Sequence, residues 1–483
     1  MAGLNNSFTS DSTQKLLDKI DQLTVIIDKL TETVTKLSVE NTALREQLNK
    51  NSKNSSKPPS SDGLKKPSPK SLRKPTSKKQ GAQEGHKGKG FSLTQSPDKT
   101  IDHVPTECIG CAKIGICTSC GVAEKRYEVD IVVNTMVIQH RTLTFKCMKE
   151  NDKIISGTFP DNITSTMQYG NNLEALALSL NTVGMVSIKR THEILSAVFG
   201  IPISTGTIHN MVMSLAGKLT DTVEHIRQAV ISSTLNHFDE TGSRVDKKTM
   251  WFHNASNEYY TYLTVSEKRG KEGMDAAGIL PAFKGIAVHD CWMPYWRYSD
   301  IRHALCCAHL LRELIGVIEN QPEQTWPQEM IDLLLKMKDV REKAVYSSKE
   351  NLSYYYLHTF DKEYDRIIKE GRIQNPIQEK KPGKRGRLAK GKVRALIERL
   401  SKYKGSVCLF TKNFLVPFDN NQAERDIRMI KVKTKVSGCF RTKEGADAFA
   451  KIMSYIGTAN KHGINSFIAV KKALTNQSDF IFA

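Results

Sequence analysis

Two short apolar stretches, each ending in an aspartate, constrain the fold of this chain more than any other feature. Leu235–Asp239 and Gly285–Asp290 have the length and apolar character of β-strands. Each would deliver its aspartate at the C-terminal end of the strand. We therefore expect the carboxylates of Asp239 and Asp290 to meet at one rim of a sheet.

The segment between these strands predicts how the sheet is built. Met250–His253 and Tyr259–Val265 are rich in aromatic and β-branched residues, and the turn-forming run Asn254–Asn257 joins them into a predicted hairpin. A helical stretch, Lys271–Phe283, leads into the second aspartate strand. The order strand, hairpin, helix, strand predicts an α/β fold with a mixed sheet and an active site at strand ends.

A third carboxylate comes from a helix predicted after Phe418, which Asp419 can cap. Glu424 lies at the start of this helix, and Asp426 points about 200° away from it. Three carboxylates in a basic chain favour two divalent cations, because oxygen ligands suit Mg²⁺ and two ions can stabilise the attacking and leaving oxygens of a phosphodiester. The candidates for holding the scissile DNA strand are Arg425, Arg428, Lys431, Lys433, Lys435 and Arg441.

Several segments closely resemble transposases of the insertion-sequence-66 type. They are Asn54–Asp62, His237–Thr241, His289–Trp292, Leu305–Leu314, Phe418–Arg428 and Ser437–Arg441. The resemblance implies that Asp239, Asp290 and Glu424 form the catalytic, magnesium-binding triad on a ribonuclease-H-like core.

The resemblance also implies a function, that of a bacterial DNA transposase. Metal-dependent hydrolysis would cleave the transposon ends, and the freed 3′-hydroxyl would join target DNA, with two Mg²⁺ ions, or Mn²⁺ in their place, as cofactors. The expected partners are transposon-end and target DNA, a second copy of the chain and accessory transposition proteins. Two other functions stay open: a ribonuclease-H-like structure-specific nuclease, and a non-catalytic dimeric DNA-binding protein, either a regulator or a decayed transposase.

Histidines near the predicted strands are expected to serve the core. His237 and His289 precede the two aspartates, where a strand histidine is more often a buried, hydrogen-bonded residue than a ligand. His303, Cys306 and His309 are spaced at i, i+3 and i+6, which does not bring side chains together on a helix. We therefore predict an apolar core helix there and no second metal site.

Length and charge bound the remaining possibilities. A chain of 483 residues exceeds the size of a single core and predicts several domains. The net charge of +20 is concentrated in three segments, 53–89, 380–394 and 428–443, and this favours a polyanionic partner. The sequence has no long apolar run and no signal-peptide pattern, so we expect a cytoplasmic protein with reduced cysteines and no membrane contact.

The N-terminal region has a heptad repeat. Apolar residues recur in steps of four and three from Leu16 to Leu48, with leucine at the d positions and Asn41 at one a position. This pattern favours a parallel two-stranded coiled coil and hence a homodimer, with Asn41 fixing the register. The alternative is an amphipathic helix that packs on its own protein.

A structural zinc site is predicted after a basic linker that is too polar to form a core. Two C-x2-C pairs offer four thiolates to a tetrahedral Zn²⁺, and either His103 or Cys147 could replace one of them. The hairpin-like segment Tyr127–Cys147 follows. The paired cysteines are Cys108, Cys111, Cys117 and Cys120.

Two further segments are candidates for DNA contact. Ser187–Gly200 and a second helix capped by Ser204 have the form of a helix-turn-helix, although an ordinary helical hairpin fits equally well. A Gly- and Pro-rich basic loop interrupts the later helical region and offers Lys384, Arg385 and Arg387 to phosphates, with a plain solvated loop as the alternative.

The predicted order of segments is a leucine-zipper coiled coil (1–50), a basic linker (51–95), a zinc-binding module (96–160), a helix-turn-helix-like region (161–230), the first part of the catalytic core (231–305), a helical insertion (306–404), the second part of the core with the Glu424 helix (405–470) and a C-terminal tail (471–483).

Overall fold

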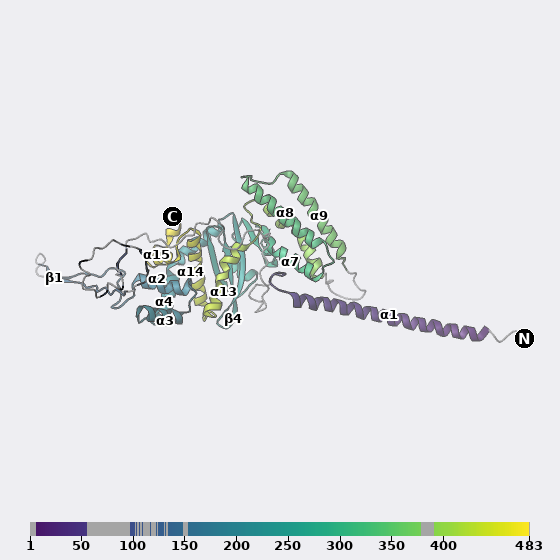
Figure 1. Cartoon of the computed structure of the whole chain (residues 1–483), viewed down its shortest axis with the longest axis horizontal. Helices are drawn as coiled ribbons and strands as arrows, with labels where there is room; N and C mark the ends of the chain where they lie inside the picture. The colour runs from purple at the N-terminus through teal and green to yellow at the C-terminus, as the bar shows by residue number, and fades with distance from the viewer. Residues whose placement is uncertain are drawn as a thin grey trace. The chain divides into compact units, whose positions relative to one another are not determined.

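A computed structural model gives the arrangement of most of the chain (Figure 1). It describes residues 6–55, 97–101, 103, 106, 109, 116, 122, 124–129, 131, 134–147, 153–377 and 391–482. The chain forms two compact units, residues 67–138 and the remainder. Some predicted site residues lie outside the described residues: Cys108, Cys111, Cys117, Cys120, Lys384, Arg385 and Arg387.

The larger unit contains the predicted mixed sheet, which is therefore confirmed. Its strand order is β5-β4-β3-β6-β7. The neighbours β5, β4 and β3 pair antiparallel, whereas β3, β6 and β7 pair parallel. The strands are β3 (Leu235–Val245), β4 (Lys248–Ser256), β5 (Thr261–Ser266), β6 (Ile286–His289) and β7 (Arg302–Leu305).

Two of these strands are longer than the sequence pattern predicts. Strand β3 continues six residues beyond Asp239 to Val245, because antiparallel pairing with β4 extends along its whole C-terminal half. Strand β4 runs to Ser256, so the predicted turn at Asn254 is wrong, and the chain turns after Asn257 instead. Asp239 therefore lies within a strand and not at its end.

Helices cover the faces and one edge of the sheet. Helix α13 (Asn421–Ser437) packs on β3 and β4, and helix α14 (Lys443–Lys461) packs on β5. The hydroxyls of Ser454 and Thr458 on α14 accept hydrogen bonds from the backbone N–H groups of Leu263 and Thr261. Helix α14 thus satisfies donors of an edge strand that would otherwise be open to pairing with another chain.

The region before the sheet is helical and includes the predicted helix pair. Helix α3 (Ile188–Phe199) ends at Gly200, whose φ of +62° is left-handed, and the Ser204 hydroxyl accepts a hydrogen bond from the Thr207 N–H at the start of the next helix, α4. The helices of this region are α2 (Asn171–Thr182), α3, α4 (Thr205–Lys218) and α5 (Thr220–Ile231).

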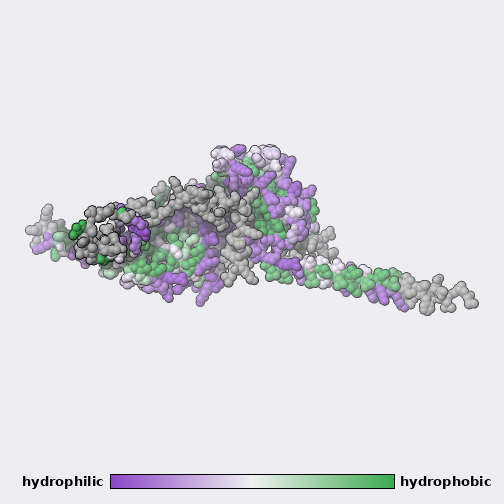
Figure 2. Space-filling model, viewed as in Figure 1, coloured by the Kyte–Doolittle hydropathy of each residue, from purple (hydrophilic) through white to green (hydrophobic). Residues whose placement is uncertain are grey.

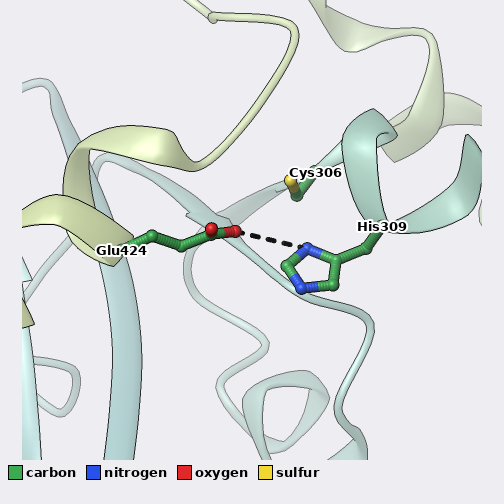
Figure 3. Close-up of side chains that lie close together, drawn as sticks. All are labelled: Cys306, His309 and Glu424. Atoms are coloured by element: carbon green, nitrogen blue, oxygen red, sulfur yellow. Dashed lines mark ion pairs between the residues drawn. The ribbon is translucent and has the colours of Figure 1, made fainter. Parts of the chain in front are cut away.

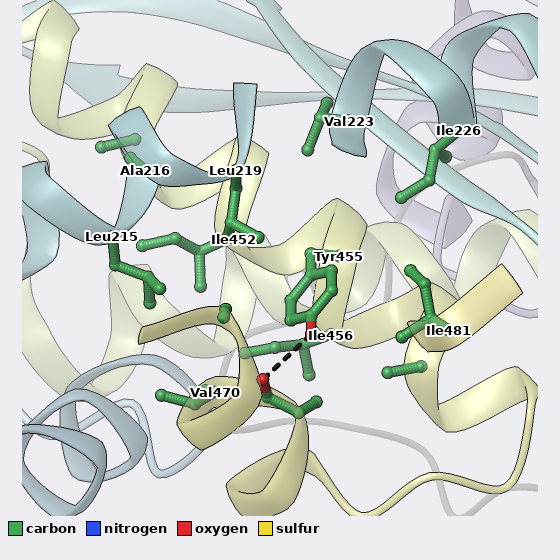
Figure 4. Packing of buried hydrophobic residues seen from close by; sticks show 14 of the residues in the cluster. Leu215, Ala216, Leu219, Val223, Ile226, Ile452, Tyr455, Ile456, Val470 and Ile481 are labelled. Carbon is green, nitrogen blue, oxygen red and sulfur yellow. Dashed lines mark hydrogen bonds between the residues drawn. The ribbon is translucent and has the colours of Figure 1, made fainter. Parts of the chain in front are cut away.

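These helices share a core with α14 and with α15 (Ser466–Leu474) (Figure 4). Leu215 and Leu219 of α4 and the following turn lie against Ile452 of α14, and the buried Tyr455 hydroxyl donates to the carbonyl of Ala469 at 2.9 Å. The region is therefore packed on the same helix that covers the sheet edge.

A helical subdomain fills the interval between β7 and α13, and its core continues onto residues of β6 and β7. Trp326 and Tyr364 are fully buried at its centre. Its helices are α7 (Cys307–Asn320), α8 (Trp326–Tyr346), α9 (Tyr354–Gln374), α10 (Lys392–Lys402), α11 (Lys404–Val407) and α12 (Leu409–Lys412). The described part before the sheet also contains a small antiparallel pair, β1 (Thr144–Cys147) and β2 (Lys153–Ser156). Only the last four residues of the predicted hairpin Tyr127–Cys147 belong to this pair, as its first strand.

The N-terminal helix α1 (Asn6–Asn49) exposes its apolar heptad residues, as the hydrophobic surface along it shows (Figure 2). Ile27 and Leu30, for example, are 59% and 57% exposed. After the helix, residues 51–55 form a turn that contacts α7, where Asn54 Nδ2 donates to Glu319 Oε2 at 2.6 Å. A Cβ atom on Gly316 would lie 2.4 Å from the Asn54 carbonyl oxygen, so this contact needs glycine there. Among the described helices, none has the length and apolar character of a membrane span.

Candidate active site

The sheet places Asp239 and Asp290 side by side. Strands β3 and β6 pair in parallel up to His237 and Val288, and continuing this register by two residues brings Asp239 level with Asp290. Adjacent strands lie about 4.8 Å apart. Both side chains then point to the same face of the sheet, because successive residues of a strand alternate between faces.

Helix α13 covers this face and carries Glu424 in its first turn. Its start is fixed by Asn420, which is 2% exposed. The Asn420 side chain accepts from His237 Nδ1 at 2.7 Å and donates to the Phe238 carbonyl at 2.8 Å. Asp419 adds a hydrogen bond from the Asn421 N–H at 3.0 Å. The helix that holds Glu424 is therefore tied to the two residues that precede Asp239.

The three carboxylates interact electrostatically. Burial and the neighbouring charges of Glu240, Asp290 and Glu424 hold the pKa of Asp239 well above its usual value. Burial, followed by Glu240, raises the pKa of Asp290 to about 6. Burial also raises the pKa of Glu424, with Asp419 and Asp290 adding to the rise and Arg312 opposing it. Half-buried carboxylates that repel one another make a site where a cation would relieve the repulsion.

Buried polar atoms without hydrogen-bond partners also indicate a cation site. Among the described residues, few buried side-chain polar atoms lack a partner, and Asn254 Oδ1, His309 Nδ1 and Glu424 Oε1 are three of them. Asn254 is the antiparallel partner of Asp239 and shares its face of the sheet. Carboxylate and amide oxygens are the ligands that Mg²⁺ prefers, so these residues fit a divalent cation.

The structure brings His309 to the same place, which the sequence reasoning missed (Figure 3). Ligand atoms of Cys306, His309 and Glu424 lie within 4.8 Å of one another, and His309 Nδ1 is 3.8 Å from Glu424 Oε1. His303 was predicted on the same helix, but it lies on strand β7 and bonds to His289 at 2.9 Å. Spacing along one helix could not indicate this proximity, because Glu424 comes from α13, far downstream in the sequence.

A second buried carboxylate network lies on the opposite face of the sheet. Glu240 is 9% exposed and accepts hydrogen bonds from the Tyr295 hydroxyl and from Arg269, each at 2.7 Å. Arg269 in turn lies over the rings of Trp251 and Trp292. This network supports β3 at the residue next to Asp239, and nothing in the local sequence pattern distinguishes Glu240 from a surface residue.

Comparison with known families decides what kind of protein carries this site. The sequence model of the transposase IS66 family matches residues 166–448, more than half of the chain, and includes Asp239, Asp290 and Glu424. The chain belongs to the IS66 transposase family. A second model, of a family of unknown function (DUF6444), matches residues 10–91 of the transposase, which include most of α1. A search of curated proteins finds no match.

The strand histidines of the transposase are buried, as predicted. His237 bonds to Asn420, and His289 is fully buried with its ring stacked on Tyr295 at 4.4 Å between centroids. Burial lowers the pKa of His289 to about 3, so its imidazole is neutral. Both imidazoles are therefore hydrogen-bonded residues of the core.

The basic residues of α13 divide into two groups. Lys433 is buried, donates to the Asn181 carbonyl at 2.9 Å, and has its pKa lowered to about 8 by burial. Lys431 donates to the Gly242 carbonyl. Both cations bind the backbone of the transposase itself, so the expectation that Lys433 faces DNA needs correction. Four candidates are exposed to solvent: Arg425, Arg428, Lys435 and Arg441.

Proposed function

We propose that this transposase cleaves transposon ends and joins the resulting 3′-hydroxyl to target DNA, with Asp239, Asp290 and Glu424 as the catalytic carboxylates. One observation carries the proposal: the register of two neighbouring strands and the packing of a remote helix bring Asp239, Asp290 and Glu424, all half-buried, to one face of the sheet. Membership of a transposase family implies that the substrate is DNA. The strand order, with three antiparallel strands continued by two parallel ones, supports a ribonuclease-H-like core.

The proposed cofactors are two Mg²⁺ ions, or Mn²⁺ in their place. Bound between the carboxylates, such ions would stabilise the attacking and leaving oxygens of the phosphodiester. The work of the protein is positioning. The β3–β6 register sets the spacing of Asp239 and Asp290, and Asn420 sets the place of Glu424 relative to both. Burial strengthens the attraction between the carboxylates and a cation, since the surroundings screen charge poorly.

We propose that the exposed cations of α13 and the segment after it contact the DNA backbone. Arg425, Arg428 and Lys435 lie on the same helix as Glu424, Arg441 follows that helix, and all four have the charge that phosphate contacts require. The basic loop with Lys384, Arg385 and Arg387 is proposed for the same role on its composition alone, and a structural Zn²⁺ on Cys108, Cys111, Cys117 and Cys120 rests on their spacing.

We also propose a homodimer through α1. The exposed leucine and isoleucine side chains of a long heptad repeat match the seam of a two-stranded coiled coil. A dimer would give one complex two active sites, one for each transposon end.

The proposal is tested by substituting single carboxylates. Asp239→Asn, Asp290→Asn and Glu424→Gln should each abolish Mg²⁺-dependent cleavage of a duplex that contains the transposon end, while DNA binding changes little. Asp300→Asn is the matched control, because Asp300 is exposed and its partners are Ser299 and Lys284, which are both exposed as well. Normal cleavage by Asp290→Asn would contradict the proposal. Cleavage without strand transfer into a target plasmid would indicate a nuclease instead.

A further inference from the structure

We propose that His309 is a fourth metal ligand of the transposase and gives the ion held by Glu424 one nitrogen ligand among its oxygens. The inference rests on the proposed function and deepens it, because it names a protein ligand from α7, a helix that lies outside the sheet and outside α13. It also predicts which metal the site prefers.

The first observation is the geometry between the two side chains (Figure 3). His309 Nδ1 and Glu424 Oε1 face each other at 3.8 Å, which is too long for a hydrogen bond. The separation lies between those of adjacent and opposite ligands of an octahedral ion bound at about 2.0–2.1 Å, so one ion can contact both atoms after a small adjustment of the side chains.

The second observation is that both atoms are buried and have no hydrogen-bond partner. Leaving a buried polar atom unpaired costs about 1–3 kcal/mol, so two such atoms that face each other indicate a missing partner between them. A cation satisfies both at once. A water molecule between them would satisfy both atoms too. In that case, however, replacing His309 would not change which metal the protein binds.

The third observation separates His309 from its neighbour Cys306. The Cys306 sulfur already accepts the Asn420 backbone N–H at 3.1 Å. Cys306 caps α7 directly before its first turn, and Asn420 stands at the same position before α13. This contact joins the starts of the two helices and so fixes the distance between His309 and Glu424. Cys306 is therefore a positioning residue and not a ligand.

The nature of the ligand predicts the metal preference. Carboxylate and carbonyl oxygens suit Mg²⁺, whereas an imidazole nitrogen favours metals later in the first transition series. A site with one histidine should bind Mn²⁺ more tightly relative to Mg²⁺ than an all-oxygen site would.

The experiment measures binding of Mn²⁺ alone and of Mg²⁺ alone to the full-length protein without DNA, by calorimetric titration. His309→Ala should weaken Mn²⁺ binding at least about tenfold, the effect typical of losing even an indirect metal partner, with a smaller loss for Mg²⁺. His309→Asp, which restores an oxygen ligand, should recover Mg²⁺ binding without the Mn²⁺ preference. His209→Ala is the control, because His209 is exposed on α4.

The outcomes distinguish this inference from the proposed function. If Asp239→Asn weakens Mn²⁺ binding and His309→Ala does not, the histidine assignment is overturned and the carboxylate site stands. If the wild-type protein binds neither metal, both are overturned. Circular dichroism of the metal-free variants checks folding, and His309→Asn replaces His309→Ala under the same criteria if the alanine variant is unfolded.

Discussion

The Asn420 side chain accepts a hydrogen bond from His237 Nδ1 at 2.7 Å, and this contact links the start of the Glu424 helix to the strand that carries Asp239. The same side chain donates to the Phe238 carbonyl. One buried asparagine therefore determines how a helix residue and a strand residue, far apart in sequence, come to face one site.

Asn420→Ala should reduce cleavage by at least about tenfold, because a small misplacement of a catalytic group has a large effect on rate. Each buried partner left unpaired should also lower the free energy of unfolding by about 1–3 kcal/mol. A purely structural role would lower stability alone. Mg²⁺ titration well below the unfolding temperature separates the two roles, since only misplacement of Glu424 weakens metal binding in a folded protein. Asn413→Ala, in a helical C-cap away from the site, is the control.

The raised pKa of Asp290 predicts how stability depends on pH. Its pKa is about 6 in the folded protein and near 3.8 when unperturbed. Between these values the folded state binds the proton and the unfolded state does not, so the metal-free protein should become more stable as pH falls from 7 to 4. The contribution is up to about 3 kcal/mol. Asp290→Asn should remove it.

Urea unfolding of both proteins at pH 7 and pH 5 measures this difference. Other groups titrate in this range as well, and the comparison with Asp290→Asn cancels their contribution. An identical pH dependence in the two proteins would show that Asp290 is not protonated in the folded state.

The exposed seam of α1 predicts a dimer that one substitution can break. Leu30→Asp places a charge at a d position, where it would be buried in a two-stranded coiled coil, and should give a monomer in light scattering. Lys29→Asp changes the neighbouring residue, which faces away from the seam, and should leave the dimer intact. A monomeric wild-type protein would remove the basis of this prediction.

The sequence patterns predict the elements of the sheet well, because local periodicity is sufficient to identify a strand or a capped helix. The Ser204 cap and the two aspartate strands are examples. The patterns do not predict properties that depend on distant partners. Lys433 is buried because the Asn181 carbonyl accepts its ammonium, and His309 meets Glu424 only because Cys306 and Asn420 join two helices. Resemblance indicated the three candidate carboxylates, but only the folded chain brings a histidine beside Glu424.

The contact between Gly316 and Asn54 can be tested directly. Gly316→Ala would place a methyl group 2.4 Å from the Asn54 carbonyl oxygen, closer than van der Waals contact allows, and should release residues 51–55 from α7. Limited proteolysis should then cleave faster near residue 55. Gly217→Ala, at a helical glycine with open space around it, is the control and should leave proteolysis unchanged.

Helix α7 carries His309 toward one end and the Gly316 and Glu319 contacts with Asn54 toward the other. These groups are separated by at most about 15 Å along a single helix, which moves as one body. A force applied to helix α1 would therefore act on α7 through the Asn54 contacts and would shift the side chain of His309. If the transposase acts as the proposed dimer, tension between its two copies would reach the candidate active site through this helix.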